Sequence, residues 1–326
     1  MEIESIMEED TERVKKRPNK SSAFSKQKRK KWLFAYLMLV PAVINFAVFY
    51  LGVNVNSVIM AFQKPIQSSG GIAYEFSFEN FTRMFRELII STQDLHTGFL
   101  NTLKYFAASL LITLPISYFT SYFLYKKVWG SKFFRVVFFL PSILPALIFV
   151  STFQNMLAIG GPLDSLWRSL FGTRFPPLLS QPETATNTIV FFTIWTGLGV
   201  NMLLYQGAMG RIPEEILDAA KLDGVGWVRE MFQIVTPMIW PTLSTTIILA
   251  LSKVFLATGP IMLFGGVGGE PFYGTTTISY FIFQKAYGNT SVEYAAAISV
   301  FFTLVSFPIV LFVRWVFGKI DPEVEY

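Results

Sequence analysis

Side chains that commonly carry out chemistry are scarce in this sequence. Its 326 residues contain one histidine, His96, and no cysteine. The lack of cysteine excludes disulfides, thiolate metal sites and a cysteine nucleophile. A single histidine leaves too little material for a histidine-based metal site or general base. Carboxylates do not cluster in their place, so the sequence has no evident catalytic set and argues against an enzyme.

The elements that must position the remaining polar residues are unusually apolar. Hydrophobic residues make up 52% of the chain, the mean hydropathy is +0.46, and 15% of the residues are charged, against roughly 25% in a typical soluble domain. A water-soluble fold of this composition would lack polar residues for its surface. We therefore expect a membrane protein.

Six uncharged runs of 20 or more residues define its spans, namely 32–63, 105–125, 136–163, 184–210, 231–252 and 294–313. A helix needs about 20 residues to cross the hydrocarbon core, and backbone groups in lipid must be satisfied within the segment. The alternation typical of a membrane β-barrel is absent. The fold class expected is an all-α polytopic membrane protein with six transmembrane helices.

Lysine and arginine predict the orientation. With the N-terminus inside, the inner loops hold 19 of these residues and the outer loops 6. Positive charge accumulates on the cytoplasmic side of membranes, so we expect both termini to be cytoplasmic in a multi-pass protein of the cell (inner) membrane. We divide the chain into a basic, disordered cytoplasmic tail (1–31), a transmembrane domain (32–318) and a C-terminal tail (319–326).

The basic run 26–31 resembles a nucleic-acid patch, but it directly precedes an apolar span. A topology signal that contacts anionic headgroups is the favoured interpretation, and no nucleic-acid partner is expected.

In the outer loops, residues 66–71 predict a flexible turn, and a short helix is expected at 163–170. The glycine-rich stretch 265–274 should end any helix that continues from the fifth span.

The loop between spans four and five is predicted to carry a short helix. Pro213 suits the first helical position, and Glu214 and Glu215 suit the positive end of the helix dipole. Gly224 suits the left-handed residue that closes the helix. The loop holds five acidic residues against three basic ones. Acidic helices are poor partners for an anionic leaflet, so a protein partner is favoured over the headgroups.

The same loop carries a recognisable pattern, Asp218-Ala-Ala-x3-Gly224-x9-Ile234-x2-Pro237. It resembles the EAA motif of membrane subunits of binding-protein-dependent ABC importers, with Asp in place of the usual Glu. Flanking matches occur at 134–145, 274–277 and 294–299. Together they resemble the carbohydrate permeases related to the maltose permease subunit.

The resemblance implies a type I ABC importer permease fold whose loop 211–237 docks on a separate ATPase. It assigns this coupling role to Glu214, Glu215, Asp218, Ala219, Ala220, Gly224 and Pro237. The chain has no G-x4-G-K-[ST] phosphate loop, so ATP and Mg would be bound by the partner. The expected partners are a second permease in a heterodimer, two ATPase subunits and an extracytoplasmic solute-binding protein.

Lys253 is the charge that stands out within a span. A charge at membrane depth is costly and normally faces a cavity or a partner. The hypothesis is that it lines the solute path and favours an acidic oligosaccharide; snorkelling or pairing with a partner permease are the alternatives. The other expected path residues are Thr193, Trp195, Thr196, Gly197, Asn201, Ser252 and Thr258. Helix packing could equally explain several of these small and polar residues.

Prolines predict where the spans bend. Pro141 and Pro145 in the third span and Pro237 and Pro241 at the start of the fifth remove backbone hydrogen bonds.

The function expected is that of a permease subunit of an ATP-driven carbohydrate importer, forming half of the path. The alternative is a stand-alone, ion-coupled secondary transporter, disfavoured because the span interiors contain no Asp or Glu.

Overall fold

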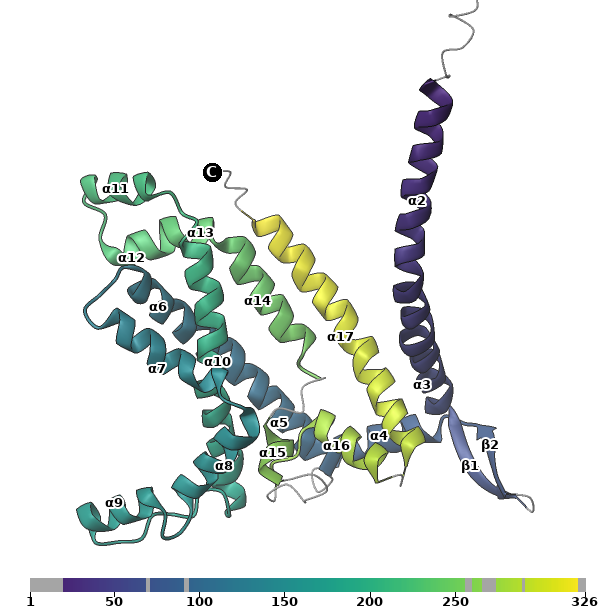
Figure 1. Ribbon diagram of the computed structural model, residues 1–326. Coiled ribbons are helices and arrows are strands. Elements are labelled where there is room, and N and C mark those ends of the chain that lie inside the picture. Colours follow the sequence, from purple (N-terminus) through teal and green to yellow (C-terminus); the bar gives the residue numbers. More distant parts are fainter. Residues whose placement is uncertain are drawn as a thin grey trace, which may run out of the picture. The chain divides into compact units, whose positions relative to one another are not determined.

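The computed structural model describes residues 20–68, 71–90, 94–255, 260–265, 274–288 and 291–321 (Figure 1). The chain divides into two units, Met1–Ile59 and Met60–Tyr326, and each is described by itself. Thr258, one of the expected path residues, lies outside the described residues, as does most of the glycine-rich stretch 265–274.

The first unit is a helical run formed by α2 (Lys20–Asn45), the π-helical turn η1 (Phe46–Gly52) and the start of α3 (Val53–Ala61). Helix α2 begins at Lys20 and so includes the end of the segment 1–31 for which a disordered tail was expected. Lysine, arginine and glutamine are good helix formers, and neither glycine nor proline interrupts 20–31, so the basic segment continues the first span as a helix.

The second unit begins with a hairpin that the sequence reading missed. Strands β1 (Gln63–Ser68) and β2 (Gly71–Phe76) pair antiparallel, with Gln63 opposite Phe76. The alternation of Ile72, Tyr74 and Phe76 after two glycines is the signal that could have indicated it. Helix α4 (Glu79–Ile89) follows, and Asn80 Nδ2 ties it to the hairpin by donating to Gln63 O at 2.9 Å.

The remaining helices are long in the spans and short between them. Span two consists of α5 (Asp94–Ala108), η2 (Ser109–Thr113) and α6 (Leu114–Tyr125), and span four is α10 (Pro182–Met209). Span six is α17 (Val292–Ile320). The connecting helices are α9 (Pro162–Phe171), α11 (Glu214–Leu222), α12 (Trp227–Arg229), α15 (Ile261–Gly265) and α16 (Ile278–Tyr287). Helix α9 confirms the helix expected at 163–170.

The third span is broken where a proline was expected to bend it. Helix α7 (Ser131–Ile143) ends before Leu144 and Pro145, both extended, and α8 (Ala146–Leu157) starts after them. Pro145 has no N–H and forces the preceding residue out of the helical region. The break confirms the bend predicted at Pro145, whereas Pro141 lies inside α7.

The fifth span is bent by 76° between Trp227–Met238 and Trp240–Ser252. The first part contains α12, the π-helical η3 (Glu230–Val235) and α13 (Thr236–Met238), and the second is α14 (Trp240–Ser252). Pro237 and Pro241 open the two helices on either side of the bend, which confirms the bend predicted there. Within the described residues, five helices are long and apolar enough to cross a membrane, and the bent pair gives a sixth if counted as one span.

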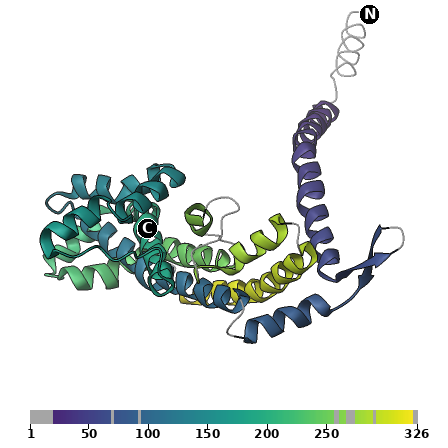
Figure 2. The ribbon, with the colours of Figure 1, turned by 90° about the horizontal axis from the view of Figure 1, so that it is seen from below.

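Helix α10 is the centre of the second unit. It packs on α6 and α7, while α17 runs beside α14 and α16 (Figures 1 and 2). Ser117 and Ser121 of α6 donate to Leu198 O and Met202 O of α10 at 3.3 and 3.0 Å. Small residues let membrane helices approach closely in this way. A Cβ atom added to Gly199 would lie 2.8 Å from Phe138 O of α7.

We predict that Gly199→Ala destabilises the protein by about 1–3 kcal/mol, because the added methyl group meets the backbone of α7, which cannot turn away. The measurement is the midpoint of thermal unfolding in detergent, which should fall by several degrees. The matched control is Gly207→Ala on the same helix, since a Cβ atom there meets nothing within 4 Å. Equal midpoints for the two variants would contradict the proposed packing.

Candidate functional site

Helix α11 has the cap that its sequence predicted, shifted by one residue. Pro213 is extended and caps the helix rather than occupying its first position, and Glu214 and Glu215 form the first turn. Gly224 has φ +70°, which confirms the predicted left-handed residue. The helix is therefore closed at both ends by residues that suit those conformations.

One face of α11 is buried and the other is exposed. Leu217 and Ala220 are 6% and 5% exposed. They lie over a buried cluster, here called the α11 cluster, of Tyr118, Tyr122, Tyr205, Met209, Ile212, Leu217, Met231, Val235, Met238 and Ile239. The exposed side of the helix carries Glu214, Glu215, Asp218 and Ala219.

The exposed face carries acidic side chains, a small side chain at its centre and an apolar side chain at the C-terminal end of the helix. Asp218 forms an exposed ion pair with Lys221 at 2.8 Å, and this hydrogen bond raises the pKa of the Lys221 ammonium. Ala219 adds no bulk beside the pair, and Leu222 is 89% exposed. The exposed face of α11 thus offers carboxylates, a small residue and one apolar side chain.

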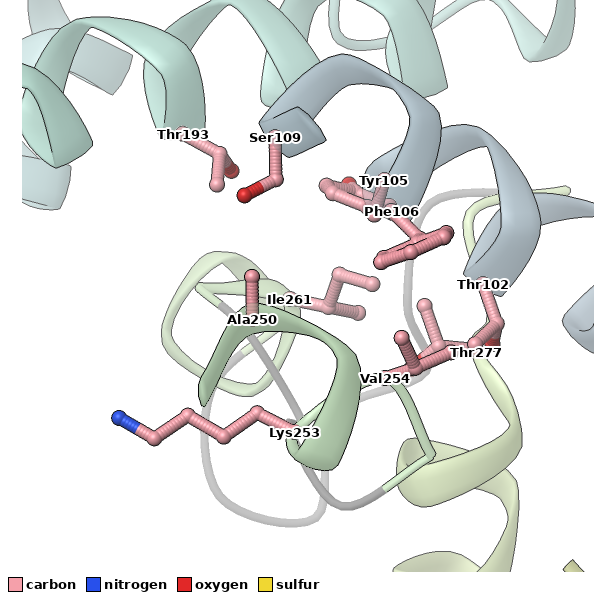
Figure 3. A pocket seen from close by; sticks show the side chains of 10 residues that line it. All are labelled: Thr102, Tyr105, Phe106, Ser109, Thr193, Ala250, Lys253, Val254, Ile261 and Thr277. Carbon is pink, nitrogen blue, oxygen red and sulfur yellow. The ribbon is translucent and has the colours of Figure 1, made fainter. Parts of the chain in front are cut away.

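A cavity of about 200 Å³ lies at the other end of the unit from α11 (Figures 1 and 3). Its lining comes from α5, η2, α10, α14, α15 and the start of α16, namely Thr102, Tyr105, Phe106, Ser109, Thr193, Ala250, Lys253, Val254, Ile261 and Thr277. The buried Tyr105 hydroxyl has no hydrogen-bond partner among the described residues. A polar solute or water could supply that partner.

The polar residues on span two were missed by the sequence reading. Thr102, Tyr105 and Ser109 follow at intervals of three and four and so share one helix face. That spacing is visible in the sequence and is the signal that could have indicated them. Ser109 opens the π-helical turn η2, and such turns often occur at functional sites because they redirect side chains.

A polar segment that was matched only as a flanking motif closes one side of this cavity. Asn101 Nδ2 donates to Gly274 O at 2.6 Å and to Thr276 O at 2.9 Å. The Thr102 hydroxyl accepts from Ile278 N at 3.0 Å. Span two therefore holds the segment 274–278 by hydrogen bonds to its backbone.

Histidine and carboxylates do not assemble into a metal site in the part of the chain that the structure describes. His96 Nδ1 donates to Leu88 O at 2.6 Å. The ring thus ties the start of α5 to the end of α4 and serves the fold.

Comparisons with known proteins decide the family. The model of the family described as binding-protein-dependent transport system inner membrane component matches residues 113–326. The chain belongs to this family. It is a membrane permease subunit of an ABC importer, as the EAA resemblance implied, and the inner membrane is its location.

Curated relatives and solved structures agree with this assignment. A probable ABC transporter permease, YesP of Bacillus subtilis, is 24% identical over 66% of this chain and 70% of the relative. The sn-glycerol-3-phosphate permease UgpA of Escherichia coli is 24% identical over 90% of this chain and 96% of its own. A bacterial ABC transporter that imports the acidic polysaccharide alginate has the same fold, with a TM-score of 0.76, 22% identity, and coverage of 91% and 99%.

The permease brings only some of the predicted path residues to a cavity. Thr193 and Lys253 border the cavity of Figure 3. Thr196 borders a second cavity of about 360 Å³ beside the break between α7 and α8. Trp195 packs on Phe149, with ring centroids 5.1 Å apart.

Gly197, Asn201 and Ser252 do not line either of these cavities. A Cβ atom on Gly197 would lie 3.2 Å from Thr113 Cγ2, so Gly197 is a packing contact with span two. Asn201 Nδ2 donates to Gly197 O at 3.0 Å, and Ser252 Oγ to Ile248 O at 2.8 Å. Both side chains are bonded within their own helices.

Lys253 borders the cavity with its aliphatic stem. Its side chain is exposed, and Figure 3 shows the ammonium directed away from the other labelled side chains. No acidic side chain of the described residues forms an ion pair with it. The charge is therefore available to a solute or a partner subunit at the edge of the cavity.

We predict that Asn101→Ala loosens the segment 274–278. Thr276 O loses the donor Asn101 Nδ2, whereas Gly274 O keeps the Thr186 hydroxyl. The cost is about 1–3 kcal/mol for one stranded buried acceptor. Amide hydrogen exchange of this segment should rise about tenfold. The control is Asn187→Ala, because Asn187 Nδ2 bonds only to Glu183 O within its own helix. Unchanged exchange in Asn101→Ala would contradict the anchoring role.

Proposed function

We propose that this permease forms half of the solute path of an ATP-driven importer of oligosaccharides and that acidic sugars are among its solutes. It pairs with a second, different permease, two ATPase subunits and an extracytoplasmic solute-binding protein. ATP and Mg are bound by the ATPase subunits, and this chain binds no cofactor. The observation that carries the proposal is the two-faced helix α11, whose buried face rests on the spans and whose acidic face is open.

The orientation proposed is that α11 and both termini are cytoplasmic. The charge asymmetry of the loops supports it, with 19 basic residues on one side and 6 on the other. Within the second unit, α11 and the C-terminal end of α17 lie at the same end (Figure 1). The cavity then opens from the extracytoplasmic half, where a binding protein would deliver the solute.

Coupling to a separate ATPase follows from the shape of α11. A helix of nine residues fixed to the spans on one face can pass a rigid-body displacement to them. Leu222 and Ala219 provide apolar contact, and Glu214, Glu215 and Asp218 favour a basic groove on the ATPase. Gly224 and Pro237 would keep α11 at a fixed angle to the fifth span.

The proposal of an acidic solute is supported by Lys253 and by a transporter of the same fold. An exposed ammonium at the edge of a cavity that contains hydroxyl-bearing side chains suits a carboxylated sugar, because charge-assisted hydrogen bonds are the stronger ones. One structure of the same fold is the alginate transporter in complex with a periplasmic protein that holds an alginate pentasaccharide. Membership of a binding-protein-dependent family leaves no support for the stand-alone secondary transporter.

We predict that Ala219→Trp releases the ATPase without unfolding the permease. Ala219 is exposed, so an indole there meets only a docked partner. The ATPase retained by tagged permease should fall at least tenfold in pull-down, with an unchanged thermal midpoint. Ala286→Trp, an exposed alanine on α16, is the control and should retain the ATPase. Full retention by both variants would refute docking on α11.

We predict that Lys253→Met lowers uptake of acidic oligosaccharides about tenfold more than uptake of neutral ones, the size expected for one charge-assisted hydrogen bond. The measurement compares a uronate tetrasaccharide with a glucose tetrasaccharide in liposomes that contain the whole importer. Lys253→Arg keeps the charge and is the control. Equal losses for the two sugars in Lys253→Met would eliminate the acidic-solute assignment.

A further inference from the structure

Glu230 differs from the other carboxylates of the loop 211–237. Glu214, Glu215, Asp218 and Asp223 are exposed, whereas the Glu230 side chain is 5% exposed. Its Oε1 lies 2.5 Å from Nζ of Lys126, whose side chain is 25% exposed. The approach at Oε1 falls outside hydrogen-bond geometry, so the contact is a charge–charge one between the loop and the end of span two.

The ion pair belongs to a set of contacts made by one face of α6. Tyr118, Tyr122 and Lys126 follow at intervals of four, which places them on the same side of the helix. The Tyr122 hydroxyl donates to Trp227 O at 3.2 Å, and the Tyr118 hydroxyl donates to Met231 O at 3.0 Å. The Lys126 ammonium also lies 5.9 Å from the centre of the Tyr122 ring.

The loop contacts this face of α6 through the π-helical turn η3. Glu230 opens the π-helical turn η3, whose Met231 carbonyl also accepts from the Thr236 hydroxyl at 2.8 Å. The Tyr118 and Thr236 hydroxyl oxygens lie 2.7 Å apart. The π-helical register brings Glu230 and Met231 to the side that α6 occupies. The apolar α11 cluster lies against the same contacts and includes Leu217 of α11.

A buried carboxylate is costly unless it is paired. The pair therefore gives the loop one favoured position on α6, and sliding or tilting would strand Glu230. Span two continues without a break from Tyr125, the residue before Lys126, through α6 and η2 to the cavity residues Ser109 and Tyr105. The end that holds the coupling loop and the end that lines the cavity are thus parts of one helix.

We propose that Lys126 and Glu230 are positioning residues that make the coupling loop and span two move as one body, so that displacement of α11 reaches the cavity through span two. The proposal rests on the proposed coupling to an ATPase. The quantity that tests the proposal is the amount of solute carried per ATP hydrolysed. A role in folding alone would lower the amount of protein and leave that ratio unchanged.

The absence of native cysteine in this chain permits a reversible replacement of the ion pair. The double variant Lys126→Cys/Glu230→Cys is joined by a bis-methanethiosulfonate, whose disulfide links are removed by reductant. The sample is the whole importer in liposomes, with both permeases, the ATPase subunits and the binding protein. ATP hydrolysis and uptake of the transported oligosaccharide are measured before and after reductant in the same preparation.

The joined sample is expected to carry within twofold as much solute per ATP as the wild-type importer, and the ratio should fall at least fivefold after reduction. ATP hydrolysis should continue in both states, because the outer face of α11 is unaltered. An unchanged ratio after reduction, or a joined sample that hydrolyses ATP without uptake, would overturn the proposal. The control is Lys127→Cys/Glu230→Cys, since Lys127 is the exposed neighbour, and crosslinking it should not restore the ratio.

Charge variants carry the same test if the cysteine pair reaches the membrane poorly. Lys126→Arg should keep the ratio within twofold of wild type, Glu230→Lys alone should lose it, and Lys126→Glu/Glu230→Lys should recover at least half. A double reversal as poor as the single one would refute the positioning role. Failure of the proposed function itself is distinguishable, because the wild-type importer would then show no ATP-dependent uptake.

Discussion

Close packing of α10 against α6 and α7 is the constraint on which both sites depend. Near the start of α10, the Thr186 hydroxyl donates to Gly274 O at 3.0 Å. Near its end, Tyr205 and Met209 lie in the α11 cluster. Gly199 permits contact with the backbone of α7 at the middle, and the serines of α6 bond to its carbonyls. In a bilayer the association of helices relies on such contacts, since lipid is as apolar as the side chains that it replaces. The cavity and α11 therefore both depend on the packing of α10 against α6 and α7.

The interruptions in the helices fall beside the two cavities and under α11. Non-helical backbone at membrane depth is tolerated only where it is buried in protein or lines a cavity. The break at Leu144 and Pro145 borders the second cavity, and η2 places Ser109 at the first. The bend at Ile239 lies under α11, within the α11 cluster. Prolines and π-helical turns thus occur beside both cavities and under α11, and the long helices connect these places.

Local chemistry made part of this structure predictable from the sequence. Gly224 and the prolines at the breaks impose conformations that depend on few neighbours, and apolar runs of sufficient length define spans. The hairpin was missed although its strands are adjacent and its alternation is local. Asn101 was missed because its partners, Gly274 and Thr276, lie far away in the chain. Asn201 and Ser252 were expected in the path, but short polar side chains in helices commonly bond to the carbonyl four residues earlier. Which face of a span meets a cavity depends on packing, and packing cannot be derived from one helix.

Carboxylates in the coupling loop have two distinct physical roles. Those exposed on α11 remain solvated, so they can form contacts with a partner at little desolvation cost. Glu230 has already lost its solvent and is compensated within the chain by Lys126. A partner that contacts the first set therefore meets a helix whose attachment is already fixed by the second. Because Leu217 of α11 shares a buried cluster with Tyr118 of α6 and Tyr205 of α10, the proposed coupling would transmit a force on the exposed face to spans two and four together.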